Sequence, residues 1–236
     1  SFFIILVVLI VLSGGSAIYL GNYYHSVDVE KYMNGSSEVS VEKFDKGWFF
    51  DGAGEEKALI FYPGAKVATE AYAPLMYQLA ESGIDCFLVD MPFHMAFFGM
   101  NRAEEIMQEY NYEAWYLGGH SLGGAMAANF AADYVEDHTD GIRGLLLLAA
   151  YPTKDLSTSD MSVVTVYGSE DGVLNMDKIV AGRELMPQDY KEVCIEGGNH
   201  AQFGSYGTQK GDGTAAIPAE EQWARTVEVF VGDESE

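Results

Sequence analysis

The stretch WYLGGHSLGGA (residues 115–125) decides the fold, because it joins an apolar strand to a helix of small residues through a glycine-rich turn. At the turn stands GHSLG (residues 119–123), a G-x-S-x-G pattern. A serine on such a tight turn has a strained backbone, and the residues two positions away on either side come very close together. Glycine at both outer positions leaves room for that approach. The pattern therefore predicts that the Ser121 hydroxyl is held in the open as a nucleophile.

A bare G-x-S-x-G pattern occurs by chance in many chains, so its context decides its meaning. Here an apolar strand precedes the turn and small residues suited to a helix (Ala125–Ala132) follow it. This is the context that the nucleophile motif requires. The alternative is a glycine-rich turn in which Ser121 only caps the helix.

The composition predicts a folded domain without a nucleic-acid partner. The 236 residues are 48% hydrophobic, which is enough for one domain with a sizeable core. The formal net charge of -23 repels phosphate backbones. The only two cysteines, Cys86 and Cys194, lie in apolar runs and are expected to be free and buried. No Cys/His spacing resembles a zinc site, so we expect no metal site.

The N-terminal segment is apolar enough to enter a membrane. It begins with FFIILVVLIVL (residues 2–12), and the first charged side chain is Asp28. An uncharged apolar run of about 20 residues can span a bilayer core. We therefore expect residues 1–21 to be a transmembrane anchor, or a signal segment cut near the small residues SGGSA (residues 13–17).

The rest of the chain divides into two parts in this interpretation. The polar residues 22–38 are expected to form a linker, and residues 39–236 are expected to form the globular domain. The acidic domain favours a single-pass protein of the cell membrane with the domain on the extracytoplasmic side.

Strand and helix patterns alternate through the globular part. Residues 39–50 read as an antiparallel hairpin, and the apolar runs that follow are continuous, as in strands covered on both faces. The predicted strands are residues 58–62, 84–89, 115–117, 141–150, 163–167 and 190–195, and the predicted helices are residues 68–81, 101–110, 125–138, 173–185 and 218–231. This alternation predicts an α/β fold with an open, mostly parallel sheet and helices on both faces.

Two further residues complete a catalytic constellation with the serine. A serine nucleophile needs a base, and the base needs an orienting acid. Active groups gather at the carboxyl ends of parallel strands. Asp171 and His200 each follow a predicted strand there. Asp155 also follows a strand and is the alternative acid, but the strand–Gly-x-x-Asp arrangement favours Asp171.

With these motifs the chain resembles the α/β-hydrolases, in which nucleophile, acid and histidine follow in this order. It resembles in particular the small, exported or membrane-anchored bacterial members that are distant relatives of dienelactone hydrolases. The resemblance covers residues 39–236. Its motifs are YPGA (62–65), GHSLG (119–123), GSED (168–171) and GGNH (197–200). Dienelactone hydrolases proper use a cysteine nucleophile, so their substrate is not carried over.

The resemblance implies a role for each residue. Ser121 is the nucleophile, His200 the general base and Asp171 the acid that orients it. The oxyanion hole is formed by the backbone amides of Leu122 and Ala65. The implied activity is that of a cofactor-free serine hydrolase, carboxylesterase-like, that cleaves esters or related acyl bonds of small molecules through an acyl-enzyme.

The substrate pocket is less specific in the sequence. Phe93 and His94 lie in MPFHMAFFGM (residues 91–100), which is either ordinary core beneath a loop or the wall of an apolar acyl pocket. Lys66 either adds positive potential beside the oxyanion hole or is simply solvated. His120 reads as a structural or pocket histidine.

A competing function is a non-catalytic surface module that binds or senses on the same scaffold. Ser121, His200 and the turn glycines are all present, which favours the enzyme. The segment 151–162 is only long enough for a loop, so we expect an open site without a large lid.

Overall fold

The computed structural model describes residues 21–138 and 141–233. The predicted membrane segment, residues 1–21, lies outside these residues except for its last position. Within the described ranges, no helix is both long and apolar enough to cross a bilayer.

A mostly parallel sheet forms the centre of the described chain. Its eight strands follow the order β1-β2-β4-β3-β5-β6-β7-β8. They are β1 (Ser40–Phe44), β2 (Gly47–Asp51), β3 (Lys57–Tyr62), β4 (Asp85–Val89), β5 (Ala114–His120), β6 (Ile142–Leu148), β7 (Ser162–Gly168) and β8 (Tyr190–Ile195). β2 is antiparallel to both of its neighbours, and all other pairs are parallel. The predicted hairpin and open parallel sheet are confirmed.

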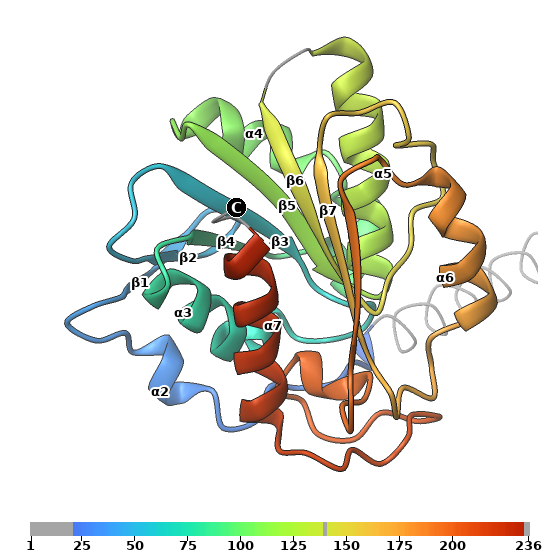
Figure 1. The fold of residues 1–236 in the computed structure, drawn as a ribbon. Helices are drawn as coiled ribbons and strands as arrows, with labels where there is room; N and C mark the ends of the chain where they lie inside the picture. The colour runs from blue at the N-terminus through green and yellow to red at the C-terminus, as the bar shows by residue number, and fades with distance from the viewer. Residues whose placement is uncertain (1–20, 139–140, 234–236) are drawn as a thin grey trace, which may run out of the picture.

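Helices cover both faces of this sheet (Figure 1). α3 (Ala73–Glu81) and α7 (Ala219–Asp233) pack on one face, with the short α2 (Glu30–Met33) beside α3. α4 (Arg102–Glu109) and α5 (Leu122–Asp137) pack on the other face. The short α6 (Met176–Gly182) follows β7.

The run of leucines in β6 shows why continuous apolar strands belong at the centre of such a fold. Leu146 and Leu148 pack in the core on the α3 and α7 side. Leu145 and Leu147 point to the opposite face and pack in the core that includes α5. Successive strand side chains alternate between faces, so a strand covered twice needs apolar residues at every position.

Two predicted helices begin later than their sequence pattern suggests. The segment from residue 68 starts as a 3-10 turn (Thr69–Tyr72) before α3 begins. Pro74 explains the break, because its ring clashes with the carbonyl of the residue four positions earlier in a continuous helix. In the segment from residue 173, the Asn175 side chain accepts a hydrogen bond from the Lys178 amide and caps α6 there.

The segment that we expected to be a linker, residues 22–38, packs against the domain. The Tyr24 amide donates to the Lys66 carbonyl oxygen, and the Val27 amide donates to the Ser205 carbonyl oxygen. The Val29 side chain is buried in the core. These backbone bonds and this apolar contact hold the segment on the surface of the fold.

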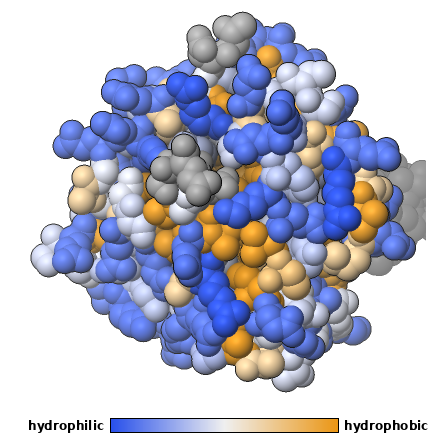
Figure 2. Space-filling model, in the orientation of Figure 1, coloured by the Kyte–Doolittle hydropathy of each residue, from blue (hydrophilic) through white to orange (hydrophobic). Residues whose placement is uncertain are grey.

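The surface agrees with the acidic composition. Figure 2 shows that hydrophilic side chains cover most of the visible face and that apolar side chains gather in its middle, around α7. A groove between α3 and α7 lies in this region, and Tyr32, Tyr77, Val227 and Val231 are among the residues that line it.

Candidate active site

Ser121 lies on a strained turn between β5 and α5. Its φ is 54° and its ψ is -122°, values that are rare for a residue other than glycine. A Cβ on Gly119 would lie 2.5 Å from the Gly123 carbonyl carbon, and a Cβ on Gly123 would lie 2.1 Å from the Tyr62 carbonyl oxygen. The glycines are therefore needed for close approach of the backbone, as the motif predicts.

The acid and the base meet at the ends of two neighbouring strands. Asp171 follows β7 and His200 follows β8, and these strands are parallel. The His200 Nδ1 atom is 2.8 Å from the Asp171 Oδ2 atom, and both side chains are only 2% exposed. Asp155, the alternative acid, is exposed and instead accepts a hydrogen bond from the Ser157 amide of its own loop.

His200 also lies beside the serine turn. The ring centroid of His120, the residue just before Ser121, is 4.4 Å from that of His200. Because β5 and β8 end at the same edge of the sheet, the nucleophile, base and acid candidates all belong to that edge.

The two predicted oxyanion donors come from segments in close contact. Leu122 is the first residue of α5, so its N–H has no acceptor within the helix. The Tyr62 and Pro63 carbonyl oxygens would lie 2.1 and 2.4 Å from a Cβ on Gly123. This approach brings the turn after β3, which contains Ala65, against the start of α5.

A buried tyrosine that no sequence motif marks, Tyr72, supports this turn. The Tyr72 hydroxyl accepts a hydrogen bond from the Gly64 amide at 3.0 Å and lies 2.8 Å from His120 Nδ1. Burial raises the pKa of Tyr72, so the phenol stays neutral. Nothing local marks Tyr72 in the sequence, because its partners are distant along the chain.

His120 is buried beside the candidate base, His200. It is 1% exposed, and burial together with the neighbouring His200 ring holds the pKa of His120 well below its ordinary value.

The predicted pocket residues lie on two loops that are tied together. Lys66, Phe93 and His94 all have positive φ angles, between 55° and 58°. The Lys66 amide donates to the His94 carbonyl oxygen at 2.8 Å. The His94 ring stacks on Tyr23 with centroids 3.8 Å apart, and burial lowers the pKa of His94. The role of these residues in a substrate pocket stays a prediction.

The loop after β4 also presents three phenylalanines to solvent. Phe93, Phe97 and Phe98 are 57%, 47% and 53% exposed. Their rings contact one another, with the Phe97 and Phe98 centroids 4.2 Å apart. Clustered, exposed aromatic side chains at the carboxyl edge of the sheet are suited to contact an apolar group of a ligand.

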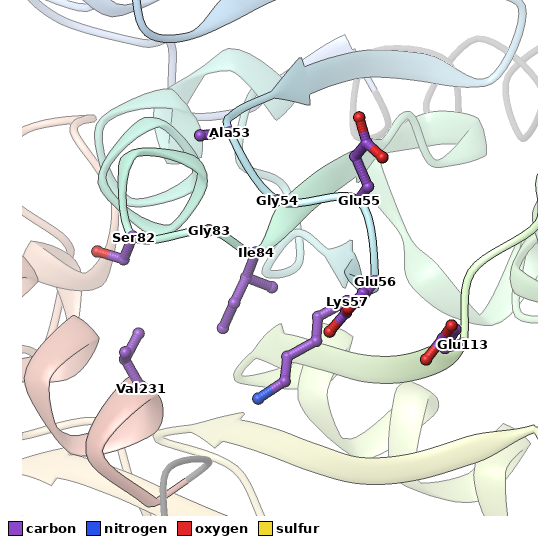
Figure 3. Close-up of a pocket in the computed structure, with 10 residues that line it drawn as sticks. All are labelled: Ala53, Gly54, Glu55, Glu56, Lys57, Ser82, Gly83, Ile84, Glu113 and Val231. Carbon is purple, nitrogen blue, oxygen red and sulfur yellow. The ribbon is translucent and has the colours of Figure 1, made fainter.

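A separate pocket lies at the opposite edge of the sheet (Figure 3). Its lining includes Lys57 at the start of β3, and Glu56 and Glu113 just before β3 and β5. Ser121 follows the other end of β5, so this pocket is not part of the candidate site. In the part of the chain that the structure describes, no group of three or more His, Cys, Asp or Glu side chains is arranged to hold a metal ion.

Comparisons with known proteins agree with this architecture. Residues 58–224 match the model of a family described as the alpha/beta hydrolase family. No curated protein matches the sequence.

Several solved structures share the fold. Carboxyl esterase 2 from Tuber melanosporum is 13% identical with a TM-score of 0.62, and 89% of each chain is covered. An esterase from Pyrobaculum calidifontis is 15% identical with a TM-score of 0.62, and 88% of each chain is covered. A monoacylglycerol lipase from Paleococcus ferrophilus is 14% identical with a TM-score of 0.59, covering 83% of this chain and 99% of the lipase. At these identities the likeness concerns the fold.

Proposed function

The chain belongs to the alpha/beta hydrolase family, and we propose that it is a cofactor-free serine hydrolase that cleaves esters of small molecules through an acyl-enzyme. The observation that carries this proposal is the buried 2.8 Å hydrogen bond between His200 Nδ1 and Asp171 Oδ2. The His200 ring lies 4.4 Å, between centroids, from the ring of His120, the residue before Ser121, whose φ is 54°. A serine on a strained turn, a histidine and a carboxylate in these positions are the parts that acyl transfer needs.

The reaction would proceed in two stages. Ser121 Oγ attacks the ester carbonyl carbon while His200 Nε2 takes the hydroxyl proton. Asp171 holds the Nδ1 proton of His200 and stabilises the imidazolium that forms. The Leu122 and Ala65 amides stabilise the negative oxygen, and each such donor is typically worth about 3 kcal/mol in the transition state.

The tetrahedral intermediate then collapses and the alcohol leaves with the proton from His200. An acyl group remains on the Ser121 oxygen. A water molecule, deprotonated by His200, attacks this acyl-enzyme, and release of the carboxylic acid restores the free serine.

An apolar acyl group would suit the surroundings of the serine. The exposed phenylalanines of the loop after β4 (Phe93, Phe97 and Phe98) stand at the edge of the sheet to which Ser121 belongs. The names of the structural neighbours, which include a carboxyl esterase and a monoacylglycerol lipase, also favour an ester over an amide.

The test is turnover of p-nitrophenyl esters from acetate to decanoate. We expect hydrolysis by the wild type and a loss of kcat of at least about a thousandfold for Ser121→Ala. Ser157→Ala, at an exposed serine in a loop, is the matched control and should retain activity. If the folded wild type hydrolyses none of these esters, the esterase proposal is wrong and a non-catalytic binding or sensing module takes its place.

We also propose that residues 1–21 anchor the protein in the cell membrane with the domain on the extracytoplasmic side. The support is the uncharged, apolar run at residues 2–12 and the acidic domain that follows. The full chain should stay with membranes after alkaline carbonate extraction, and protease added to intact cells should digest the domain. Release of the protein by carbonate would contradict the anchor.

A further inference from the structure

Asp212 is a carboxylate that the proposed reaction does not use, yet it bonds to the backbone of both loops that carry the acid and the base. Its Oδ1 atom accepts hydrogen bonds from the amides of Gly172 at 3.1 Å, His200 at 3.2 Å and Gly213 at 2.8 Å. Its Oδ2 atom accepts a hydrogen bond from the Ala201 amide at 2.8 Å. Hydrogen bonds from N–H groups to an ionised carboxylate are stronger than those to neutral acceptors.

The two loops are those of the candidate triad. Gly172 directly follows Asp171, and the other two donors outside the Asp212 segment are His200 itself and Ala201. Asp212 therefore joins the backbone at the acid to the backbone at the base. The Nδ1–Oδ2 hydrogen bond between His200 and Asp171 depends on the relative position of these two stretches of backbone.

The segment around Asp212 is itself held tightly against both loops. A Cβ on Gly213 would lie 2.0 Å from the Glu170 carbonyl oxygen, and one on Gly172 would lie 2.6 Å from the Gly211 carbonyl oxygen. On the other loop, the Asn199 side-chain amide donates to the Gly213 carbonyl oxygen at 2.8 Å. The segment thus has little freedom to move away when the imidazole becomes charged.

We propose that Asp212 is a positioning residue that keeps the Asp171 and His200 side chains at hydrogen-bond distance from each other during the reaction. This inference rests on the proposed serine-hydrolase function and deepens it. When His200 takes the serine proton, the two loops must hold the imidazolium at hydrogen-bond distance from Asp171. A misplacement of about 1 Å in such a geometry can cost about a hundredfold in rate.

The main test variant is Asp212→Asn, which keeps the size of the side chain. Whichever way the new amide turns, its NH2 group faces at least one backbone N–H, and the negative charge is lost. Asp212→Ala is the second variant and removes both acceptors. Asp155→Asn is the matched control, because Asp155 also accepts a backbone N–H, that of Ser157, but within its own loop.

Rates are measured per active site, counted from the burst of p-nitrophenol, so that unfolded protein does not contribute. We expect kcat of Asp212→Asn to fall about ten- to a hundredfold with KM changed less than about twofold. The kcat of Asp212→Ala should fall by at least as much, and the kcat and KM of Asp155→Asn should match those of the wild type. The low-field proton NMR signal of the His200–Asp171 hydrogen bond should shift or broaden in both Asp212 variants only.

Two outcomes separate this inference from the proposed function. If Ser121→Ala is inactive but Asp212→Asn keeps both the wild-type kcat and the wild-type NMR signal, the positioning role is wrong and the hydrolase proposal stands. If the wild type itself shows no turnover that depends on Ser121, the hydrolase proposal fails. The NMR signal, which needs no turnover, then still tests the positioning role, and an unchanged signal in both Asp212 variants overturns it.

Discussion

Ser121 has a backbone conformation that costs free energy by itself, and its neighbours make that conformation possible. Its φ of 54° is compatible with the fold because Gly119 and Gly123 approach other backbone atoms within van der Waals contact. The turn at Pro63–Ala65 lies in the same contact, so a change at Gly123 affects both the proposed nucleophile and the proposed oxyanion donors.

Gly123→Ala tests this close packing directly. The new methyl group would lie 2.1 Å from the Tyr62 carbonyl oxygen and 2.4 Å from the Pro63 carbonyl oxygen, so the backbone must move. We expect esterase activity to fall at least about a hundredfold, because the Ser121 turn and the Ala65 amide separate. Urea unfolding should show a loss of stability of about 1–3 kcal/mol.

Gly232→Ala is the control for that variant. Among the residues that the structure describes, nothing lies within 4 Å of a Cβ at this position in α7. In a helix, alanine should increase stability by up to about 1 kcal/mol without changing kcat. Equal activity of Gly123→Ala and the wild type would contradict the account of the turn.

Tyr72→Phe separates hydrogen bonding from packing beside the oxyanion turn. The ring stays in place, but the Gly64 amide and His120 Nδ1 lose their shared partner. A buried donor left without an acceptor costs about 1–3 kcal/mol, and we expect that loss in urea unfolding. kcat should fall more than KM changes, whereas an unchanged kcat would show that the Tyr72 hydroxyl does not support the turn.

At the scale of elements, the Glu192 carboxylate links the edge strand β8 to β7 and to the segment after α6. Arg183 donates to both oxygens of Glu192 at 2.7 and 2.8 Å, and the Tyr167 and Tyr190 hydroxyls also donate to it. Hydrogen bonding from Arg183 is the main cause that lowers the pKa of Glu192 to about 2. Since β8 leads to His200, this cluster stabilises the element that carries the proposed base.

The lowered pKa of Glu192 predicts how stability depends on pH. The folded-state pKa of about 2 is below the ordinary value of 4.5, so the stabilisation is fully present above about pH 4.5 and is lost as the pH falls toward 2. Glu192→Gln should lower the free energy of unfolding by about 1 kcal/mol at neutral pH, since the half-exposed Arg183 is screened by solvent.

Urea titrations over this pH range check that prediction. The difference between Glu192→Gln and the wild type should shrink below about pH 4.5. Glu184→Gln, an exposed carboxylate near the same arginine in the chain, is the control and should show a much smaller change. A difference that stays constant down to acid pH would contradict the role of the charge.

The sequence predicts the elements better than their ends. The apolar runs identify the strands, because a strand that is buried on both faces needs an apolar side chain at every position, as in Leu145–Leu148. The starts of α3 and α6 depend instead on local chemistry at Pro74 and Asn175, which overrides the helical pattern of the sequence. The candidate site is also only partly predictable from the sequence. Ser121, Asp171 and His200 lie in recognisable motifs. Tyr72 and Asp212 contact groups that only the fold brings close to them.

At the scale of the whole molecule, the negative net charge lowers the free energy of unfolding. The chain carries a formal charge of -23, and like charges on a compact surface repel one another. Salt screens this repulsion over a distance of about 10 Å at about 0.1 M.

Thermal unfolding at increasing NaCl concentration measures the effect of this charge. We expect the Tm to rise by about 2–4 °C between low salt and about 0.5 M NaCl, which corresponds to about 1 kcal/mol for a chain of this size. An equal osmolality of glycerol is the control for effects other than screening. A Tm that falls over the same range of salt would contradict a net repulsive surface.

Ser121 is the proposed nucleophile of a serine hydrolase. The most direct measurement is the intact mass of the protein after treatment with a fluorophosphonate, followed by peptide mapping. We expect one phosphonyl adduct on the peptide that contains Ser121, and none in Ser121→Ala. Labelling of folded wild type at another residue, or no labelling at all, would contradict it.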